Sequence, residues 1–359
     1  MVRLAAKYEN EAMTSRAGTA LAAVARSLAV ALSVAAIVAG CGAGPTATPV
    51  ATPAWTPTAS AGTSTAVATD SAVPSPSPGP TASSPAAATS AAASGLPDFR
   101  HVYVIVMENK SYRSIVGSAS APYLNSLIAR YGSATNLRAE THPSEPNYIA
   151  LVSGGLQGVR TDGGYTLKAT SLFDQIEAAG RTWHVYAQGY PGHCFKGSQS
   201  AAVVDGPGSS GQYVRKHNPA ISFAAISGNP TRCARITKLG GFDPAAADFE
   251  MIIPNQINDM HSSSVRTGDN FLRTFVPKIT GNPAFAGSLL VITWDEGAGS
   301  DSAGGGGHIA TIIASPGMKA GSKFTAPATH YSLLRTIELA WGLPLLGGAA
   351  TASTVALPY

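Results

Sequence analysis

Short apolar runs alternate with amphipathic stretches along most of the chain. Residues 101–109, HVYVIVMEN, are a continuous apolar run rich in β-branched side chains, which predicts a strand buried on both faces. The segment APYLNSLIARYG, at 121–132, has its apolar residues at helical spacing. The pattern therefore begins with a strand, a loop and a helix.

The same alternation continues to a C-terminal helix. A second unit begins near Ala134 and leads into a helix at 147–155, which Gly154 and Gly155 end. Further strands are predicted at 182–188, 248–255, 287–297 and 308–316, and further helices at 171–180, 265–280 and 330–342. This order predicts an α/β fold, with a largely parallel central sheet covered by helices on both sides.

The first quarter of the chain has a different composition. Residues 1–41 carry basic side chains and an apolar run too short to span a membrane, which is typical of a signal peptide. The run ends in VAGC, similar to a bacterial lipobox in which Cys41 is lipidated; ordinary cleavage near VAG is the alternative, and Met13 is an alternative start. Residues 42–95 are nearly all Ala, Thr, Ser, Pro and Gly, which predicts a disordered tether with a reach of roughly 40 Å.

One folded domain is predicted at 96–359, in an extracytoplasmic location, lipid-anchored to the bacterial cell membrane or secreted. Its two cysteines, Cys194 and Cys233, favour a disulfide in an oxidising compartment, with two separately buried thiols as the alternative. The net charge of +4 is not clustered, so we expect no nucleic-acid partner. We also expect a monomer.

Polar side chains follow the predicted strands at their carboxyl ends, where ligands bind in parallel sheets. Glu108 and Asn109 end the first strand, Asp295 and Glu296 end the fifth, and the polar segment 255–261 follows the fourth. Such an oxygen-rich cluster suits a hard divalent cation, while solvated loop residues or helix caps are the alternative. Five histidines also lie at element edges, where each could bind a metal, contact a phosphoryl group or form a structural hydrogen bond: His142, His217, His261, His308 and His330.

Ser144 lies between two prolines in THPSEPNY, just before a predicted helix. It could cap that helix, or it could be a nucleophile placed at the positive end of the helix dipole. No G-x-S-x-G, H-E-x-x-H or Walker A sequence is present, so the common serine esterases, zinc proteases and P-loop enzymes are disfavoured.

Several longer motifs occur in one order: HVYVIVMENKSY, THPSEPNYIALVSG, VRKHNPAISF, IIPNQINDMHS, VITWDEG, GGGGHIATIIASPGMKAG and THYSLLRTIE. In this order they resemble the bacterial phosphoesterase family of acid phosphatases and phosphocholine-preferring phospholipases C. The resemblance implies a three-layer α/β/α sandwich like that of alkaline phosphatase, with a metal-supported nucleophile.

The resemblance also implies roles for individual residues. It implies that Ser144 is the nucleophile and also contacts the metal. The metal ligands that it implies are Glu108, Asn109, Asp295 and Glu296, and Asn109 would also contact the phosphate. It implies that His217 and His261 contact the phosphoryl group or the leaving oxygen, and His308 and His330 are weaker candidates. Glu145 departs from the pattern, since many relatives have an apolar residue there; it either reshapes the pocket or faces solvent.

The sequence therefore predicts a tethered extracytoplasmic hydrolase of phosphoric esters that works through a phosphoserine and a divalent metal, Mg, Mn, Ca, Zn or Fe. Two alternatives stay open. One is a phospholipase C that cleaves phosphatidylcholine-type lipids of the adjacent membrane, although those relatives tend to be longer. The other is a surface protein that binds phosphate- or sulfate-bearing polymers without turnover.

Overall fold

The computed structural model describes residues 95–200, 205 and 212–355. The predicted signal peptide, the lipobox with Cys41 and all of the predicted tether except Gly95 lie outside these residues. In the part of the chain that is described, no helix combines the length and the apolar character needed to cross a membrane.

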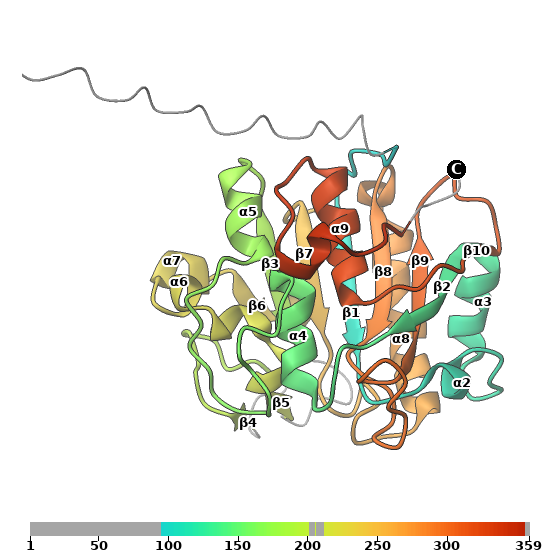
Figure 1. Ribbon diagram of the computed structural model, residues 1–359, viewed down its shortest axis with the longest axis horizontal. Coiled ribbons are helices and arrows are strands. Elements are labelled where there is room, and N and C mark those ends of the chain that lie inside the picture. Colours follow the sequence, from blue (N-terminus) through green and yellow to red (C-terminus); the bar gives the residue numbers. More distant parts are fainter. Residues whose placement is uncertain (1–94, 201–204, 206–211, 356–359) are drawn as a thin grey trace, which may run out of the picture. The chain divides into compact units, whose positions relative to one another are not determined.

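An eight-stranded sheet forms the centre of the described domain (Figure 1). In sheet order the strands are β10 (Ser322–Phe324), β2 (Gly132–Arg138), β9 (His308–Ala314), β8 (Leu289–Trp294), β1 (Val102–Met107), β7 (Phe249–Ile253), β3 (Trp183–Ala187) and β6 (Ile236–Lys238). Neighbouring strands are parallel except that β9 runs antiparallel to both β8 and β2. The segment between β8 and β9 contains no helix, which suits an antiparallel connection.

β1 lies in the middle of the sheet, where its apolar side chains are shielded from water on both faces. All six residues of VYVIVM are buried, and β1 pairs in parallel with β7 on one side and β8 on the other. β7 and β8 are also buried along their whole lengths, as expected for parallel strands that helices cover on both faces.

Helices cover both faces of the sheet. On the face toward the viewer in Figure 1, α4 (Ser144–Ser153) packs against α5 (Leu172–Ala178) and α9 (His330–Ala340). Behind the sheet, α8 (Val265–Thr280) packs beside α3 (Pro122–Arg130). The predicted α/β/α sandwich with a largely parallel sheet is therefore confirmed.

The remaining elements are short. They are the helices α2 (Tyr112–Ile115), α6 (Ala224–Ser227) and α7 (Pro230–Cys233), the 3-10 turns η2 (Arg215–His217), η3 (Pro219–Ser222), η4 (Leu239–Gly241), η5 (Pro283–Phe285) and η6 (Gly347–Ala350), and the hairpin of β4 (Gln199–Ser200) with β5 (Tyr213–Val214). The sequence pattern did not predict these elements, nor the edge strands β6 and β10. It also placed the start of α4 three residues too late.

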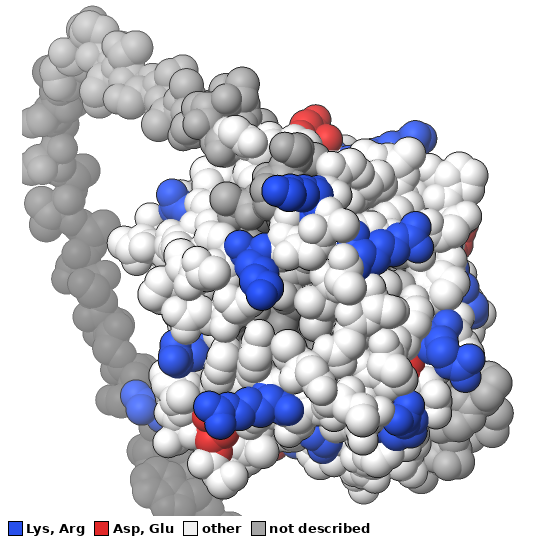
Figure 2. All heavy atoms as spheres, turned by 90° about the vertical axis from the view of Figure 1, so that its right-hand side faces the viewer, with Lys and Arg blue, Asp and Glu red and all other residues white. Residues whose placement is uncertain are grey.

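Cys194, in the loop after β3, and Cys233, at the end of α7, form a disulfide with a Cα–Cα distance of 5.5 Å. Figure 2 shows lysine and arginine side chains spread over one face of the molecule rather than gathered in one patch.

Candidate active site

The carboxyl ends of three adjacent strands bring four acidic side chains together. Glu108 follows β1, Asp295 and Glu296 follow β8, and Asp259 lies in the turn after β7. All four are buried. Backbone hydrogen bonds fix the three segments to one another: Glu108 N donates to Asp259 O at 2.9 Å, and Asp295 N donates to Met107 O at 2.9 Å.

Asn109 turns the chain at the end of β1 and links two of these acids. Its φ of 53° lies in the left-handed region, which is uncommon for a residue with a side chain and often occurs at functional sites. In this conformation its backbone N–H donates to Asp295 Oδ1 at 3.1 Å, while its Nδ2 donates to Glu108 Oε2 at 2.9 Å.

Ser144 is the first residue of α4 and is 1% exposed. Its Oγ lies 3.3 Å from Glu108 Oε2 and 3.4 Å from Glu296 Oε1, and Pro143 occupies the N-cap position. The hydroxyl thus faces the carboxylates instead of capping the helix. The structure brings together Ser144, Asn109 and the predicted acids, although their catalytic and metal-binding roles stay predictions.

His217, in η2, lies within the same cluster. Its Nε2 is 3.1 Å from Glu108 Oε1, and its Nδ1 is 3.5 Å from Asp259 Oδ2. The imidazole stacks on Tyr148, with ring centroids 5.3 Å apart, and the Tyr148 hydroxyl donates to Glu108 Oε1 at 2.6 Å. The ring of His261, half exposed, lies 5.8 Å from that of His217 between centroids.

Two further contacts of the cluster, Asp259 and Tyr148, were not assigned from the sequence, while His142 was named only among the five histidines at element edges. Asp259 belongs to the polar segment 255–261, whose position after a strand was the available signal. Tyr148 is four residues after Ser144 and so lies on the same side of the helix. His142 bridges Glu296 Oε2, at 2.7 Å from Nδ1, and Asp301 O, at 2.9 Å from Nε2.

The two weaker histidine candidates make other contacts. His308 Nε2 lies 3.0 Å from Thr135 O, and its ring stacks on Tyr112 at 4.3 Å. Buried His330 places Nδ1 2.5 Å from Glu140 Oε2 and Nε2 2.9 Å from Trp294 O. Since carboxylate and carbonyl oxygens both accept, His330 donates from both nitrogens and holds the residue before Asp295.

Glu145 does not face solvent, because it is 1% exposed. Its carboxylate accepts hydrogen bonds from Gly163 N at 2.6 Å and from Ser222 Oγ at 3.3 Å. Burial raises its pKa to about 7 against the opposing effect of these donors and of Arg215. Glu145 therefore links the start of α4 to the loop at Gly163 and to η3.

Burial and mutual repulsion make the cluster unfavourable for four negative charges. Burial raises the pKa of Glu108 and Asp259 well above their usual values, and the charge of Asp295 raises both further. Burial, followed by the charge of Asp295, also raises the pKa of Glu296 to about 7. Conversely, burial holds the pKa of His217 well below its usual range, so the ring is neutral and can act as a ligand. A nearby cation would reverse the penalty on the carboxylates.

The geometry of the cluster fits a divalent cation. Glu108, His217 and Asp259 each offer an atom such that all three lie within 4.8 Å of one another. Although His217 Nε2 lies near Glu108 and Asp259 Oδ2 near His217, neither atom forms a hydrogen bond within the described part of the chain, and both are buried. Buried polar atoms normally have partners, so these two are suited to a metal ion, and the mix of nitrogen and oxygen admits Zn, Fe or Mn as well as harder ions.

Comparison with known proteins gives consistent matches. The model of the family described as "Phosphoesterase family" matches residues 118–344. A Mycobacterium tuberculosis protein named "Phosphatidylinositol-3-phosphatase" is 34% identical over 273 residues, which cover 73% of this chain and 84% of that protein. An "Acid phosphatase" from Aspergillus fumigatus is 29% identical over 69% of this chain and 56% of its own length. A solved structure from Vibrio parahaemolyticus, titled as a protein in the alkaline phosphatase superfamily, has a TM-score of 0.49 at 12% identity, with 71% of each chain covered.

Proposed function

Because the chain belongs to the Phosphoesterase family, we propose that it hydrolyses phosphoric monoesters with Ser144 as the nucleophile and a divalent metal as cofactor. Family membership confirms the resemblance predicted from the sequence motifs and the predicted class of enzyme, a hydrolase of phosphoric esters. The observation that carries the finer proposal is the buried Ser144 hydroxyl, within 3.4 Å of two carboxylates at the start of a helix.

In the proposed reaction, Ser144 Oγ attacks phosphorus while the bond to the leaving alcohol breaks. The hydroxyl proton passes to a carboxylate, for which Glu296 or Glu108 is in reach. Water then attacks the phosphoserine, the bond between Oγ and phosphorus breaks, and Ser144 regains a proton. The net change is ester plus water to alcohol plus inorganic phosphate.

Other residues position the phosphoryl group and the leaving group. The positive end of the α4 helix dipole favours a negative charge beside Ser144, although the N–H of Glu145 already donates to Asp162 Oδ1 at 3.1 Å and Pro146 has no N–H. His261 is half exposed beside the buried cluster and is the proposed donor to the leaving oxygen. Burial and the charges of Lys216 and Lys110 lower the pKa of His261, so we expect the ring to carry the proton for this step at acidic pH.

Two overlapping sets of residues would hold the metal. The family resemblance favours Glu108, Asn109, Asp295, Glu296 and Ser144, while atom distances favour Glu108, His217 and Asp259. When bound, the ion would lower the pKa of a coordinated hydroxyl and withdraw charge from a phosphoryl oxygen. Metal content of purified Asp259→Asn and Asp295→Asn variants separates the sets: the variant that removes a ligand should lose metal at free-ion concentrations that saturate the other.

The decisive test of the nucleophile is Ser144→Ala, assayed with p-nitrophenyl phosphate. We expect kcat to fall by about 1,000-fold or more, since nucleophile removal leaves only binding and electrostatic effects. Ser114→Ala, an exposed serine, is the matched control and should keep full activity. Acid-quenched wild-type protein should carry phosphate on the Ser144 peptide. Activity of folded Ser144→Ala close to wild type would overturn the assignment.

The substrate class has one specific indication. The Mycobacterium tuberculosis relative is named for a phosphatidylinositol 3-phosphate substrate, which is a lipid that carries a phosphoric monoester. We therefore propose lipid phosphate monoesters as substrates beside soluble ones. Assays that measure phosphate release from phosphatidylinositol 3-phosphate and phosphocholine release from phosphatidylcholine separate this from the phospholipase C alternative.

We further propose that the enzyme is anchored on the outer face of the cell membrane through Cys41. The lipobox-like VAGC and the Ala/Thr/Ser/Pro-rich segment after it support this location. Labelled palmitate should be incorporated into the full chain and not into Cys41→Ala. Equal incorporation into both proteins would contradict the anchor.

A further inference from the structure

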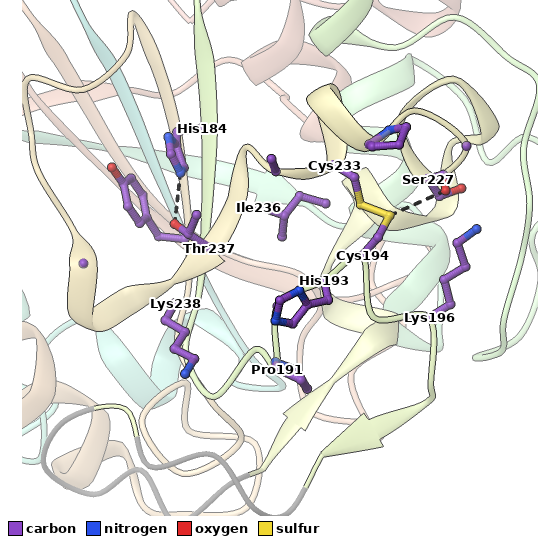
Figure 3. Close-up of a pocket in the computed structure, with 16 residues that line it drawn as sticks. His184, Pro191, His193, Cys194, Lys196, Ser227, Cys233, Ile236, Thr237 and Lys238 are labelled. Atoms are coloured by element: carbon purple, nitrogen blue, oxygen red, sulfur yellow. Dashed lines mark hydrogen bonds between the residues drawn. A yellow bond between two sulfur atoms is a disulfide. The ribbon is translucent and has the colours of Figure 1, made fainter.

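A large cavity lies beside the edge strand β6, apart from the acidic cluster. Its volume is about 1240 Å³, and none of the residues assigned to catalysis lines it. The loop after β3, strand β6 and the region of α7 form its walls (Figure 3). The cavity is therefore large enough for a ligand of its own.

The charge of the lining is one-sided. Sixteen residues line the cavity; Lys196 and Lys238 are its charged residues, and none is Asp or Glu. His184 and His193 line it as well, and burial together with the charge of Arg235 lowers the pKa of His184, so that ring is neutral. In Figure 3, Lys196 and Lys238 lie on opposite sides of His193, below the disulfide. Neither ammonium group forms an ion pair with a described residue, and both side chains are exposed. Their charges are thus available to an anion.

The part of the wall that carries His193 and Lys196 is held in place by a covalent link. The Cys194–Cys233 disulfide joins the loop after β3 to α7. His193 and Cys194 have φ values of 51° and 55°, two consecutive left-handed residues, and Cys194 Sγ lies 3.5 Å from Ser227 O. Opposite them, His184 Nε2 lies 2.9 Å from Thr237 Oγ1. Strained backbone that a covalent link maintains is typical of a binding site built before its ligand arrives.

The strand register relates the cavity to the catalytic cluster. Lys238 of β6 pairs with Ala187 of β3, which in turn pairs with Ile253 of β7. The preceding residue of β7, Ile252, pairs with Ile105 near the end of β1. Lys238 is therefore at the level of the carboxyl end of β1, three strand spacings or about 14 Å away along the sheet. Lys238 and the cluster thus lie toward the same end of the sheet, while the cavity extends along the sheet to His184 near the start of β3.

We propose that this cavity is an accessory binding site for phosphate-bearing polyanions, separate from the site at Ser144. The inference rests on the two exposed lysines of the lining, the disulfide-linked wall and the position of Lys238 at the carboxyl end of the sheet, and it does not require the proposed catalytic mechanism. Soluble polyphosphorylated molecules and clustered lipid headgroups share the chemistry that such a lining recognises. Binding should weaken as salt concentration rises, because exposed charges are screened.

Equilibrium dialysis with inorganic tripolyphosphate tests the proposal on the full chain, with orthovanadate present to occupy the Ser144 site. The double variant Lys196→Gln/Lys238→Gln should bind about 10-fold more weakly than wild type. Lys319→Gln/Lys323→Gln removes two exposed lysines at the opposite edge of the sheet, around β10, and should bind like wild type. Equal affinity of all three proteins would overturn the proposal, as would equal loss in both double variants.

A second set of measurements distinguishes a lipid ligand from a soluble one, and distinguishes anion binding in the cavity from catalysis at Ser144. Sedimentation with phosphatidylcholine vesicles, with and without phosphatidylinositol phosphate, is done with Cys41→Ala added to all three proteins so that no lipid anchor contributes. It supports lipid headgroups as the ligand if only the cavity variant loses binding. Tripolyphosphate binding without vesicle binding supports a soluble ligand. Turnover of p-nitrophenyl phosphate should be the same in all three proteins, and its absence from wild type would refute the proposed function while the binding result stands.

Discussion

Replacing Glu250 with glutamine should stabilise the protein increasingly as pH rises. Glu250 lies in β7 and is fully buried. Its Oε1 accepts from Ala247 N at 3.3 Å, and its Oε2 has no hydrogen-bond partner in the described chain. Burial, reinforced by Asp243, raises its pKa from 4.5 to about 8. The folded protein therefore keeps a proton on Glu250 in a pH range where the unfolded chain has lost it.

The sign and size of the effect follow from this difference in proton binding. Between pH 4.5 and about 8 the folded state binds more protons at Glu250, so the free energy of unfolding falls as pH rises. Each pH unit is equivalent to about 1.4 kcal/mol, which gives a ceiling of about 4 kcal/mol between pH 5 and pH 8. Glutamine resembles the protonated acid and stays neutral, so the variant lacks this loss.

Urea unfolding of wild type and Glu250→Gln at several pH values measures the difference. The advantage of the variant should grow by about 2–4 kcal/mol from pH 5 to pH 8, and contributions from all other groups cancel in the comparison. Glu177→Gln, at a half-buried position whose carboxylate pairs with arginines, is a control that should show no such growth. A constant difference between Glu250→Gln and wild type across this range would refute the reasoning.

Three further predictions concern the disulfide and the acidic cluster. Cys194→Ala/Cys233→Ala opens a link between residues 39 apart, so the urea midpoint should fall by an amount equivalent to about 4 kcal/mol by loop-closure entropy; an unchanged midpoint would contradict this. Tyr148→Phe removes the hydrogen bond to Glu108, so dialysis should show metal affinity reduced about 10-fold to 100-fold, and unchanged affinity would exclude a positioning role. Dialysis against EDTA should abolish aryl phosphate hydrolysis and a divalent ion should restore it, whereas chelator-resistant activity would exclude the metal.

The central strands could be predicted because the apolar residues within each strand are enough to indicate that it is buried, without knowledge of the strands beside it. Six consecutive apolar residues, as in VYVIVM, have few structures open to them other than a strand buried on both faces. In contrast, β6 and β10 have three residues each, and both include an exposed lysine, so nothing in their patterns separates them from loops. Their pairing depends on a neighbouring strand that is distant in sequence.

The same distinction applies to the site. Glu108 and Asp295 could be placed together because both follow buried strands of one parallel sheet. His330 could not be assigned to its partner, since Glu140 is 190 residues away and only the docking of α9 brings them together. Asp259 was overlooked in favour of His261 because the turn after β7, and not the residue type, decides which side chain points inward.

The central place of β1 also determines when the active site can form. Although β1 comes first among the strands, its two neighbours follow about 150 and 190 residues later, so closing the centre of the sheet requires long loops to be ordered first. Such a topology folds slowly compared with one built from local contacts. During synthesis the acids of the cluster stay apart until nearly the whole domain has emerged. The acidic cluster of a nascent chain therefore assembles only near the end of synthesis.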